Sequence, residues 1–230
     1  MPIEIGPPSI PSKTNAVILN KPNTITRSNL HWELGDKRVY PSEETTHLGI
    51  IRAELKENQL NVEARISLAR RPLYSLINTG VHGLNPKVSF KIYQCYVLPR
   101  LLYGIEIFPL SKTHFDMLNK FHMKNLMNFQ SRPSRTAKGA TLLLTGALPL
   151  EAEIHRRQLS FSHNILACNN TTIQDLAERQ LVMNIDNPLS FFCITSQLLH
   201  QYGLPDINTL AKNQPKKISW KYAVWEAVCK

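Results

Sequence analysis

The pattern of apolar and polar positions changes once along the chain, near residue 54. Before that point the apolar runs are short and are separated by turn residues, which is typical of β-strands. We expect a strand at 16–19, a hairpin at 31–40 that turns at Gly35-Asp36, and a strand at 45–51. After it, apolar residues recur at helical spacing. Strands followed by helices predict an α+β fold, with a small N-terminal antiparallel β portion followed by a mainly helical region.

The helical part divides at prolines, glycines and capping residues. Pro72 and Pro99 lie inside apolar stretches and should kink or divide them. The stretch between Pro205 and Pro215 is expected to be a loop. We expect helices over 54–79, 86–104, 111–128, 136–145, 149–167, 172–183, 188–201 and 217–229. The predicted parts are a β portion at 1–53, a helical region at 54–168 and a helical extension at 169–230.

The positive charge of the chain is concentrated in its middle. The formal net charge is +10. Residues 1–50 carry five basic and five acidic side chains, residues 51–160 carry sixteen and seven, and residues 161–230 carry six and five. The net of +9 in the middle segment indicates a surface for a polyanion, because weak Coulomb attractions add along a phosphate backbone. A solvated basic surface gives the same pattern, and charge alone leaves both interpretations open.

Several kinds of chemistry lack the residues that they need. Nucleotidyl transfer needs paired carboxylates for two metal ions, but the five aspartates are scattered along the sequence. The four cysteines have long, irregular gaps that fit neither a zinc site nor a disulfide framework. No glycine-rich phosphate loop occurs. We therefore expect no catalytic residue, no metal site and no cofactor in this chain by itself.

Nothing in the sequence predicts a membrane segment. No apolar run approaches the ~18 residues that would span a bilayer. The first residues lack the basic and apolar regions of a signal peptide. The expected protein is intracellular, with nuclear and cytoplasmic placement both open, and it has no membrane partner.

Several short patterns occur in the order in which one enzyme family has them. The segment 11–14 reads Pro-Ser-Lys-Thr and precedes an apolar strand, and 46–50 reads Thr-His-Leu-Gly-Ile. Further patterns stand at Arg65–Arg71, Leu84–Pro86, Val97–Gly104, Arg135-Thr136, Gly146–Ile154 and Trp220-Lys221. The series, over roughly residues 11–165, resembles the C-terminal palm edge, thumb and post-thumb region of non-LTR (LINE-type) retrotransposon reverse transcriptases. The catalytic turn with its paired aspartates, which precedes the lysine motif in that family, is absent.

The resemblance implies roles for two groups near the N-terminal end of the series. Lys13 would belong to the lysine motif that follows the catalytic turn. His47, Leu48 and Gly49 would form the primer grip, where Gly49 would allow close approach to the primer 3′ end. Without the family, Gly49 reads equally well as a bulge in an ordinary strand.

A third implied group lies on the first predicted helix. Arg65, Arg70 and Arg71 span less than two helical turns and can share part of one flank. In a thumb this flank would follow the phosphates of the hybrid. The alternative is a solvated helix face.

Two more basic clusters follow in the sequence. Arg132, Arg135 and Lys138 surround Pro133, which restricts the loop and lowers the entropy cost of holding guanidinium groups ready for phosphate. Arg156-Arg157 forms another cluster on a later helix. Solvated basic surfaces explain both clusters equally well.

Four aromatic residues could stack on bases, but their spacing follows the apolar face. We expect core positions for Tyr93, Tyr96, Tyr103 and Phe108.

The resulting hypothesis is a non-catalytic fragment of a reverse-transcriptase-like protein that binds the backbone of RNA or an RNA–DNA hybrid without sequence preference. Two alternatives remain open: a helical scaffold, and a decayed retroelement relic with no nucleic-acid function. A relic would leave an exposed sheet edge and self-associate through it. An active polymerase would need carboxylates from another chain.

Overall fold

A computed structural model describes residues 14–19, 30–35, 37–81 and 85–229, and for 75–81 it describes the backbone alone. It has small antiparallel sheets near the N-terminus followed by helices, which confirms the predicted α+β fold class. The chain divides into two compact units, Met1–Asn61 and Val62–Lys230. The boundary falls inside the first helix, α1 (Glu57–Val81).

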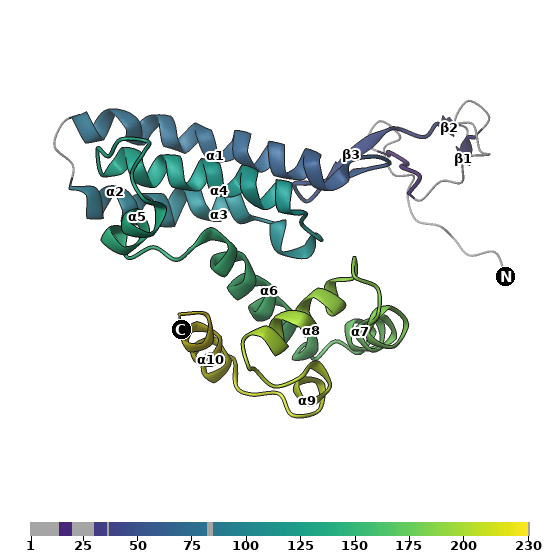
Figure 1. The fold of residues 1–230 in the computed structure, drawn as a ribbon. Helices are drawn as coiled ribbons and strands as arrows, with labels where there is room; N and C mark the ends of the chain where they lie inside the picture. Colours follow the sequence, from purple (N-terminus) through teal and green to yellow (C-terminus); the bar gives the residue numbers. More distant parts are fainter. Residues whose placement is uncertain (1–13, 20–29, 36, 82–84, 230) are drawn as a thin grey trace. The chain divides into compact units, whose positions relative to one another are not determined.

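The first unit contains two hairpins (purple and blue in Figure 1). Strands β1 (Trp32–Leu34) and β2 (Lys37–Val39) pair antiparallel, so the predicted hairpin is confirmed in its described residues, which exclude Asp36. Strands β3 (Glu44–His47) and β4 (Ile50–Ala53) also pair antiparallel. The prediction of one strand over 45–51 was therefore wrong: Leu48 and Gly49 both have positive φ, 50° and 77°, and reverse the chain in a tight turn.

The other predicted strand is reduced to a single contact. In the stretch 16–19, only Ala16 forms a β-bridge, to Pro41, and Ser42 N–H donates to the carbonyl of Ala16 at 2.7 Å. Pro41 has no N–H to donate, so the bridge between Ala16 and Pro41 does not extend into a ladder.

The β3–β4 hairpin is tied to the start of α1 by two side chains, Asn61 and Glu57; the Glu57 carboxylate accepts from Ala53 N–H at 3.3 Å and pairs with Arg52 at 3.4 Å. The Asn61 amide accepts from Ile51 N–H at 2.9 Å and donates to the Ile51 carbonyl at 2.7 Å. It also donates to the Glu57 carbonyl at 2.9 Å. Asn61 is 1% exposed, and its amide gives the Ile51 backbone the pair of bonds that a neighbouring strand would supply.

The second unit begins inside α1, at Val62, and continues with a compact group of helices. The buried stripe of α1 is Val62, Ile66, Ala69 and Leu73. Pro72 was expected to kink or divide this stretch, and it does not divide it, because α1 continues through Pro72 to Val81. Packing of this stripe offsets the backbone bond that proline removes. The remaining helices of the group are α2 (Pro86–Ile92), the π-helix η3 (Tyr93–Val97), α3 (Leu98–Leu102), the 3₁₀ turn η4 (Ile105–Ile107), α4 (Lys112–Phe129) and α5 (Lys138–Thr145).

The helix predicted over 86–104 contains the expected irregularity at Pro99. The chain passes from α2 through the π-helix η3 into α3, where Pro99 occupies one of the first two positions. Proline clashes with the carbonyl four residues earlier in a regular α-helix, and a π-turn relieves that clash.

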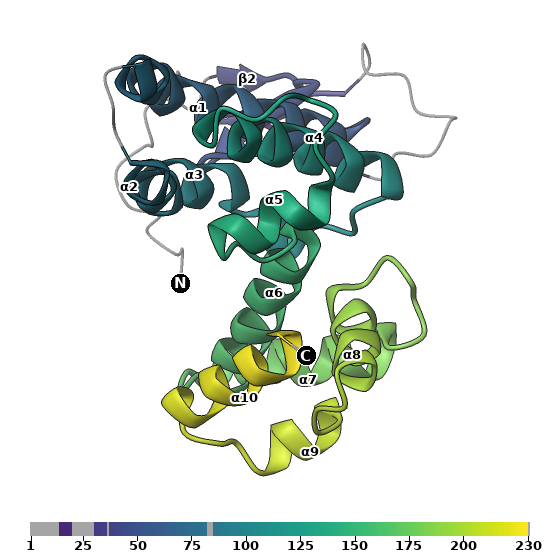
Figure 2. The same ribbon diagram turned by 60° about the vertical axis from the view of Figure 1, so that its left-hand side comes forward.

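The long helix α6 (Leu150–Leu166) leads to the remaining helices (Figure 2). They are α7 (Thr171–Asn184), α8 (Phe191–Gln201), α9 (Ile207–Lys212) and α10 (Lys217–Cys229). Helix α9 was not predicted, and α8 begins three residues later than expected after Pro188. The Asn187 side chain accepts from Leu189 N–H at 3.0 Å and forms a turn in place of a first helical turn.

The unit has two clusters of buried residues. One extends from Val62 to Ile154, and the other from Leu159 to Val224. Trp220 belongs to the second cluster, and its indole N–H donates to the Leu159 carbonyl at 3.0 Å. Helix α6 contributes to both clusters.

Candidate nucleic-acid interface

A groove of about 560 Å³ runs along α4 and the loop that follows it. Four exposed cations line it: Lys120 and Lys124 from α4, Arg132 from the loop, and Lys138 from the start of α5. We call this surface the α4 groove. It combines two residues that the sequence predicted as phosphate contacts, Arg132 and Lys138, with two that it did not.

The two lysines are placed by the register of α4. They are four residues apart and therefore lie one above the other on the same face. The start of the helix is fixed by a capping box. In it, the Ser111 side chain accepts from His114 N–H and the His114 side chain accepts from Ser111 N–H. Met123 and Met127 are buried and supply the apolar part of the groove's lining.

The loop side of the groove is fixed by hydrogen bonds. Arg132 N–H donates to the Met127 carbonyl at 2.9 Å, which folds the loop back on α4. Thr136 donates to the Pro133 carbonyl through its N–H and its hydroxyl, at 3.0 and 2.8 Å. The Gln130 side chain donates to the carbonyls of Leu126 and Thr141, both at 3.2 Å, and joins the end of α4 to α5. The Arg132 and Lys138 backbones are thus held before any ligand arrives.

The charge of the groove is unbalanced. Asp116 is the one acidic residue among its lining residues, so four cations and one anion give a net of +3. Within the described part of the chain, no ion pair within 4.0 Å involves Lys120, Lys124, Arg132 or Lys138. Cations without partners keep their full attraction for a polyanion.

The other predicted phosphate contacts lie elsewhere. Arg135 is exposed in the same loop but does not line the groove. Arg70 and Arg71 are exposed on α1 and do not line it either.

Arg65 does not share a flank with these two arginines, and that prediction was wrong. It is 6% exposed, and its guanidinium carbon lies 4.7 Å above the centre of the Tyr103 ring. Burial lowers the pKa of Arg65 from its ordinary value, while the nearby Tyr103 and Glu106 oppose that shift. Because its charge is already engaged inside the protein, Arg65 is a structural residue rather than a phosphate contact.

The predicted primer-grip residues lie at the end of the β3–β4 hairpin, where His47 ends β3 and Leu48 and Gly49 form the turn. His47, Leu48 and Gly49 are all exposed, with Leu48 at 76%. Gly49 is a turn residue rather than a bulge in a strand. Lys13 lies outside the described residues.

The aromatic residues are split between core and surface. Tyr93 and Phe108 are buried as expected, but Tyr96 and Tyr103 are 60% and 48% exposed. The π-helix turns Tyr96 away from the face that the apolar spacing predicts.

Comparisons with protein-family models, curated proteins and solved structures found no significant match to this chain. Interpretation of the site therefore depends on its own geometry.

Among the residues that the structure describes, no group of three or more His, Cys, Asp or Glu side chains is arranged to hold a metal ion. No helix of the described chain is long and apolar enough to cross a bilayer.

Sequence reasoning could have found Lys120 and Lys124 from their spacing of four residues on a predicted helix. The signal that they share a groove with Arg132 and Lys138 is absent from the sequence, because it depends on how the loop folds back.

Proposed function

We propose that this chain binds the phosphate backbone of RNA or an RNA–DNA duplex through the α4 groove, inside the cell and without catalysing a reaction by itself. The observation that carries this proposal is the set of four cations along one groove, which have no ion pair in the described part of the chain and share the groove with a single acidic residue. Their spacing along a helix and a fixed loop suits a rigid polyanion, since the cations need little reordering on binding.

The resemblance to the thumb region of LINE-type reverse transcriptases supports the same function. In that interpretation the chain is a binding fragment of a longer or divided polymerase, and the catalytic carboxylates lie outside it. Base preference is not expected, because lysine and arginine contacts to phosphate carry no sequence information.

The proposal is tested by measuring binding to a 16-base-pair RNA–DNA hybrid across a salt series. The groove variant is Lys120→Gln with Lys124→Gln. The matched control is Lys217→Gln with Lys221→Gln, which removes two exposed lysines at the same spacing from α10. Both pairs remove two charges and keep side-chain length.

Wild-type protein and the α10 control should bind with the same steep salt dependence. In the groove variant the slope of log K against log salt should fall by about 2, because two phosphate contacts each contribute about 0.9. Affinity near 0.1 M salt should fall by about tenfold. Equal losses in the two variants would show that binding follows net charge rather than the groove. A folded wild-type protein that does not bind the hybrid at low salt would favour the scaffold or relic alternatives.

A further inference from the structure

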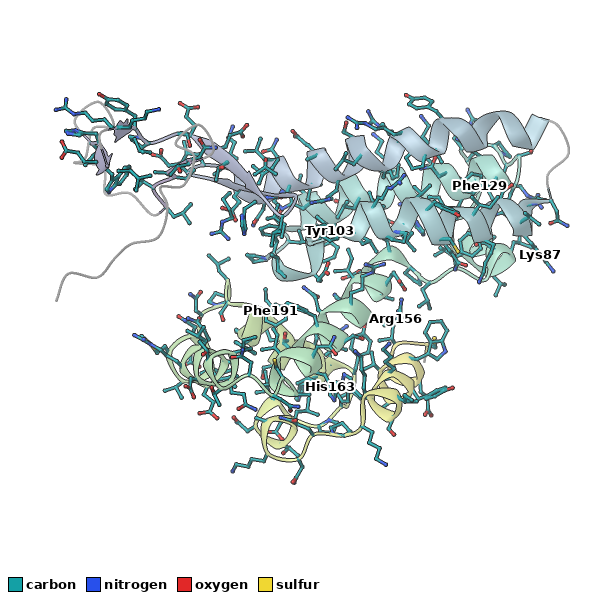
Figure 3. The ribbon with its side chains drawn as sticks, turned by 180° about the vertical axis from the view of Figure 1, so that it is seen from behind. Lys87, Tyr103, Phe129, Arg156, His163 and Phe191 are labelled. Atoms are coloured by element: carbon teal, nitrogen blue, oxygen red, sulfur yellow. The ribbon has the colours of Figure 1, made fainter. Side chains whose placement is uncertain are left out.

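A second cavity, of about 250 Å³, lies between η3, α4, α6 and α10. Its polar lining includes His122, Glu153, Arg156 and Arg157, and its apolar lining includes Phe90 and Trp225. It shares no lining residue with the α4 groove. We call it the α6 cavity. Arg156, which lies on α6 on the side of α10, is labelled in Figure 3.

His122 presents a hydrogen-bond donor that the protein does not use. The residue is 2% exposed, its Nδ1 lies 2.8 Å from the Tyr93 hydroxyl, and its Nε2 has no hydrogen-bond partner. If Tyr93 O–H donates to Nδ1, one group remains unsatisfied, the Nε2–H. The opposite tautomer would leave two unsatisfied groups, the Tyr93 hydroxyl hydrogen and the Nε2 lone pair, and is therefore disfavoured.

Burial keeps this imidazole neutral. It lowers the pKa of His122 to about 4. Near neutral pH the ring is therefore a neutral donor through Nε2–H, and it adds no charge to the cavity.

Arg157 supplies a second unused donor at the same cavity. Its Nε is buried without a hydrogen bond and lies 3.8 Å from Glu153 Oε1, an ion-pair distance too long for a hydrogen bond. Glu153 is instead engaged by Arg156, whose Nη2 and Nε donate to its two oxygens at 2.5 and 3.1 Å. Burial lowers the pKa of Arg157, and Glu153 and Glu106 oppose that shift.

The charges that line the cavity leave room for one negative charge. Arg156, Arg157 and Glu153 line it, and these side chains total two positive charges and one negative charge. A monoanion would neutralise the set, whereas a dianion would reverse its sign. The Arg156 guanidinium carbon also lies 5.8 Å from the centre of the Trp225 ring, so a flat apolar wall adjoins the charged one.

We propose that the α6 cavity binds a small organic monocarboxylate, whose oxygens accept hydrogen bonds from His122 Nε2 and Arg157 Nε and whose apolar part lies against Phe90 and Trp225. Two buried donors without partners, on residues that line the same cavity, favour an acceptor ligand, since an unsatisfied buried donor is costly. The site is independent of the proposed nucleic-acid function.

The test uses benzoate as the probe, with binding to the full chain followed by calorimetry and by the side-chain ¹H–¹⁵N signals of His122. Benzamide has the same shape without the charge, and inorganic phosphate carries more charge without the ring. We expect benzoate to bind with a dissociation constant of about 1 mM and benzamide at least about tenfold more weakly. The His122 Nε2–H signal should shift with benzoate alone.

The informative variant is His122→Asn, because the asparagine amide can replace Nδ1 toward Tyr93 but cannot replace Nε2 toward the cavity. Benzoate affinity should fall by about tenfold in this variant, and it should be unchanged in Lys120→Gln with Lys124→Gln. Equal binding of benzoate and benzamide, tighter binding of phosphate, or no binding of benzoate at about 10 mM would each overturn the proposal. These comparisons on the wild-type chain hold even if the His122 variant does not fold.

Discussion

Lowering the pH should destabilise the folded protein through one buried side chain, His122. Burial lowers its pKa from the ordinary value of 6.5 to about 4. The unfolded chain therefore takes up a proton more readily than the folded one. The contribution of His122 to stability is complete above about pH 6.5 and is lost as the pH falls toward 4.

The size of the effect follows from the shift. A difference of 2.5 pH units at about 1.4 kcal/mol per unit gives a total loss of about 3 kcal/mol at and below pH 4. About 2 kcal/mol of it should be lost between pH 7 and pH 5, where few carboxylates titrate. This is a substantial part of the 5–15 kcal/mol by which proteins of about this size are stable.

Urea unfolding at pH 7, 6 and 5, followed by circular dichroism, measures this loss directly. The His122→Asn variant is the control, because it has no imidazole to titrate and should lose about 2 kcal/mol less over the same range. His155, whose pKa is also lowered by burial, is present in both proteins and cancels in the comparison. If wild type and variant lose the same stability between pH 7 and pH 5, His122 is not a neutral buried group in the folded state.

Three further changes test the packing and the turns. Asn61→Asp removes the amide N–H groups that donate to the Ile51 and Glu57 carbonyls. It should lower the free energy of unfolding by about 3 kcal/mol and speed hydrogen exchange at the Ile51 amide. Unchanged exchange would contradict the tie between the hairpin and α1. Gly49→Ala places a side chain at a φ of 77° and should destabilise the β3–β4 hairpin by about 1 kcal/mol. The change should appear as faster hydrogen exchange of the hairpin amides, and Gly49→Asn should have a smaller effect. Leu101→Ala empties a position that is 0% exposed and should cost about 3 kcal/mol in urea unfolding; a loss below about 1 kcal/mol would mean that the core collapses around the gap.

The fold class and most helices could be predicted because they depend on local patterns. The Ser111 cap fixes the start of α4, and the repeat of buried positions in α1 defines its inward face. The prediction failed where packing outweighs a local signal. Pro72 predicts a kink or a division, but α1 is not divided there, and its buried residues Ala69 and Leu73 lie on either side of the proline. The short helix α9 lies between two prolines and is stabilised by burial of Ile207 and Leu210, which local composition does not reveal.

The candidate site was predictable in part. The basic loop of Arg132 and Lys138 was recognised from charge, because exposed charge is visible in composition. The burial of Arg65 against Tyr103 was not, since it depends on a contact between residues 38 positions apart in the sequence. The His122–Tyr93 pair and the cavity beside it were missed for the same reason. A lone histidine on an apolar helix face shows neither which nitrogen is used nor what space it faces.

The π-helix η3 gives this chain an unusual tolerance to losing a residue. Deleting one residue from an α-helix rotates everything after it by about 100° and moves buried side chains to the surface. A π-turn already holds one residue more than an α-turn. Gln94, Cys95 and Tyr96 are exposed between the buried Tyr93 and Val97. Removing Cys95 together with Pro99→Ala should therefore close the turn into a regular helix and leave both flanks in place. The π-turn therefore resembles a one-residue insertion in a regular α-helix. We expect the shortened chain to form that regular helix.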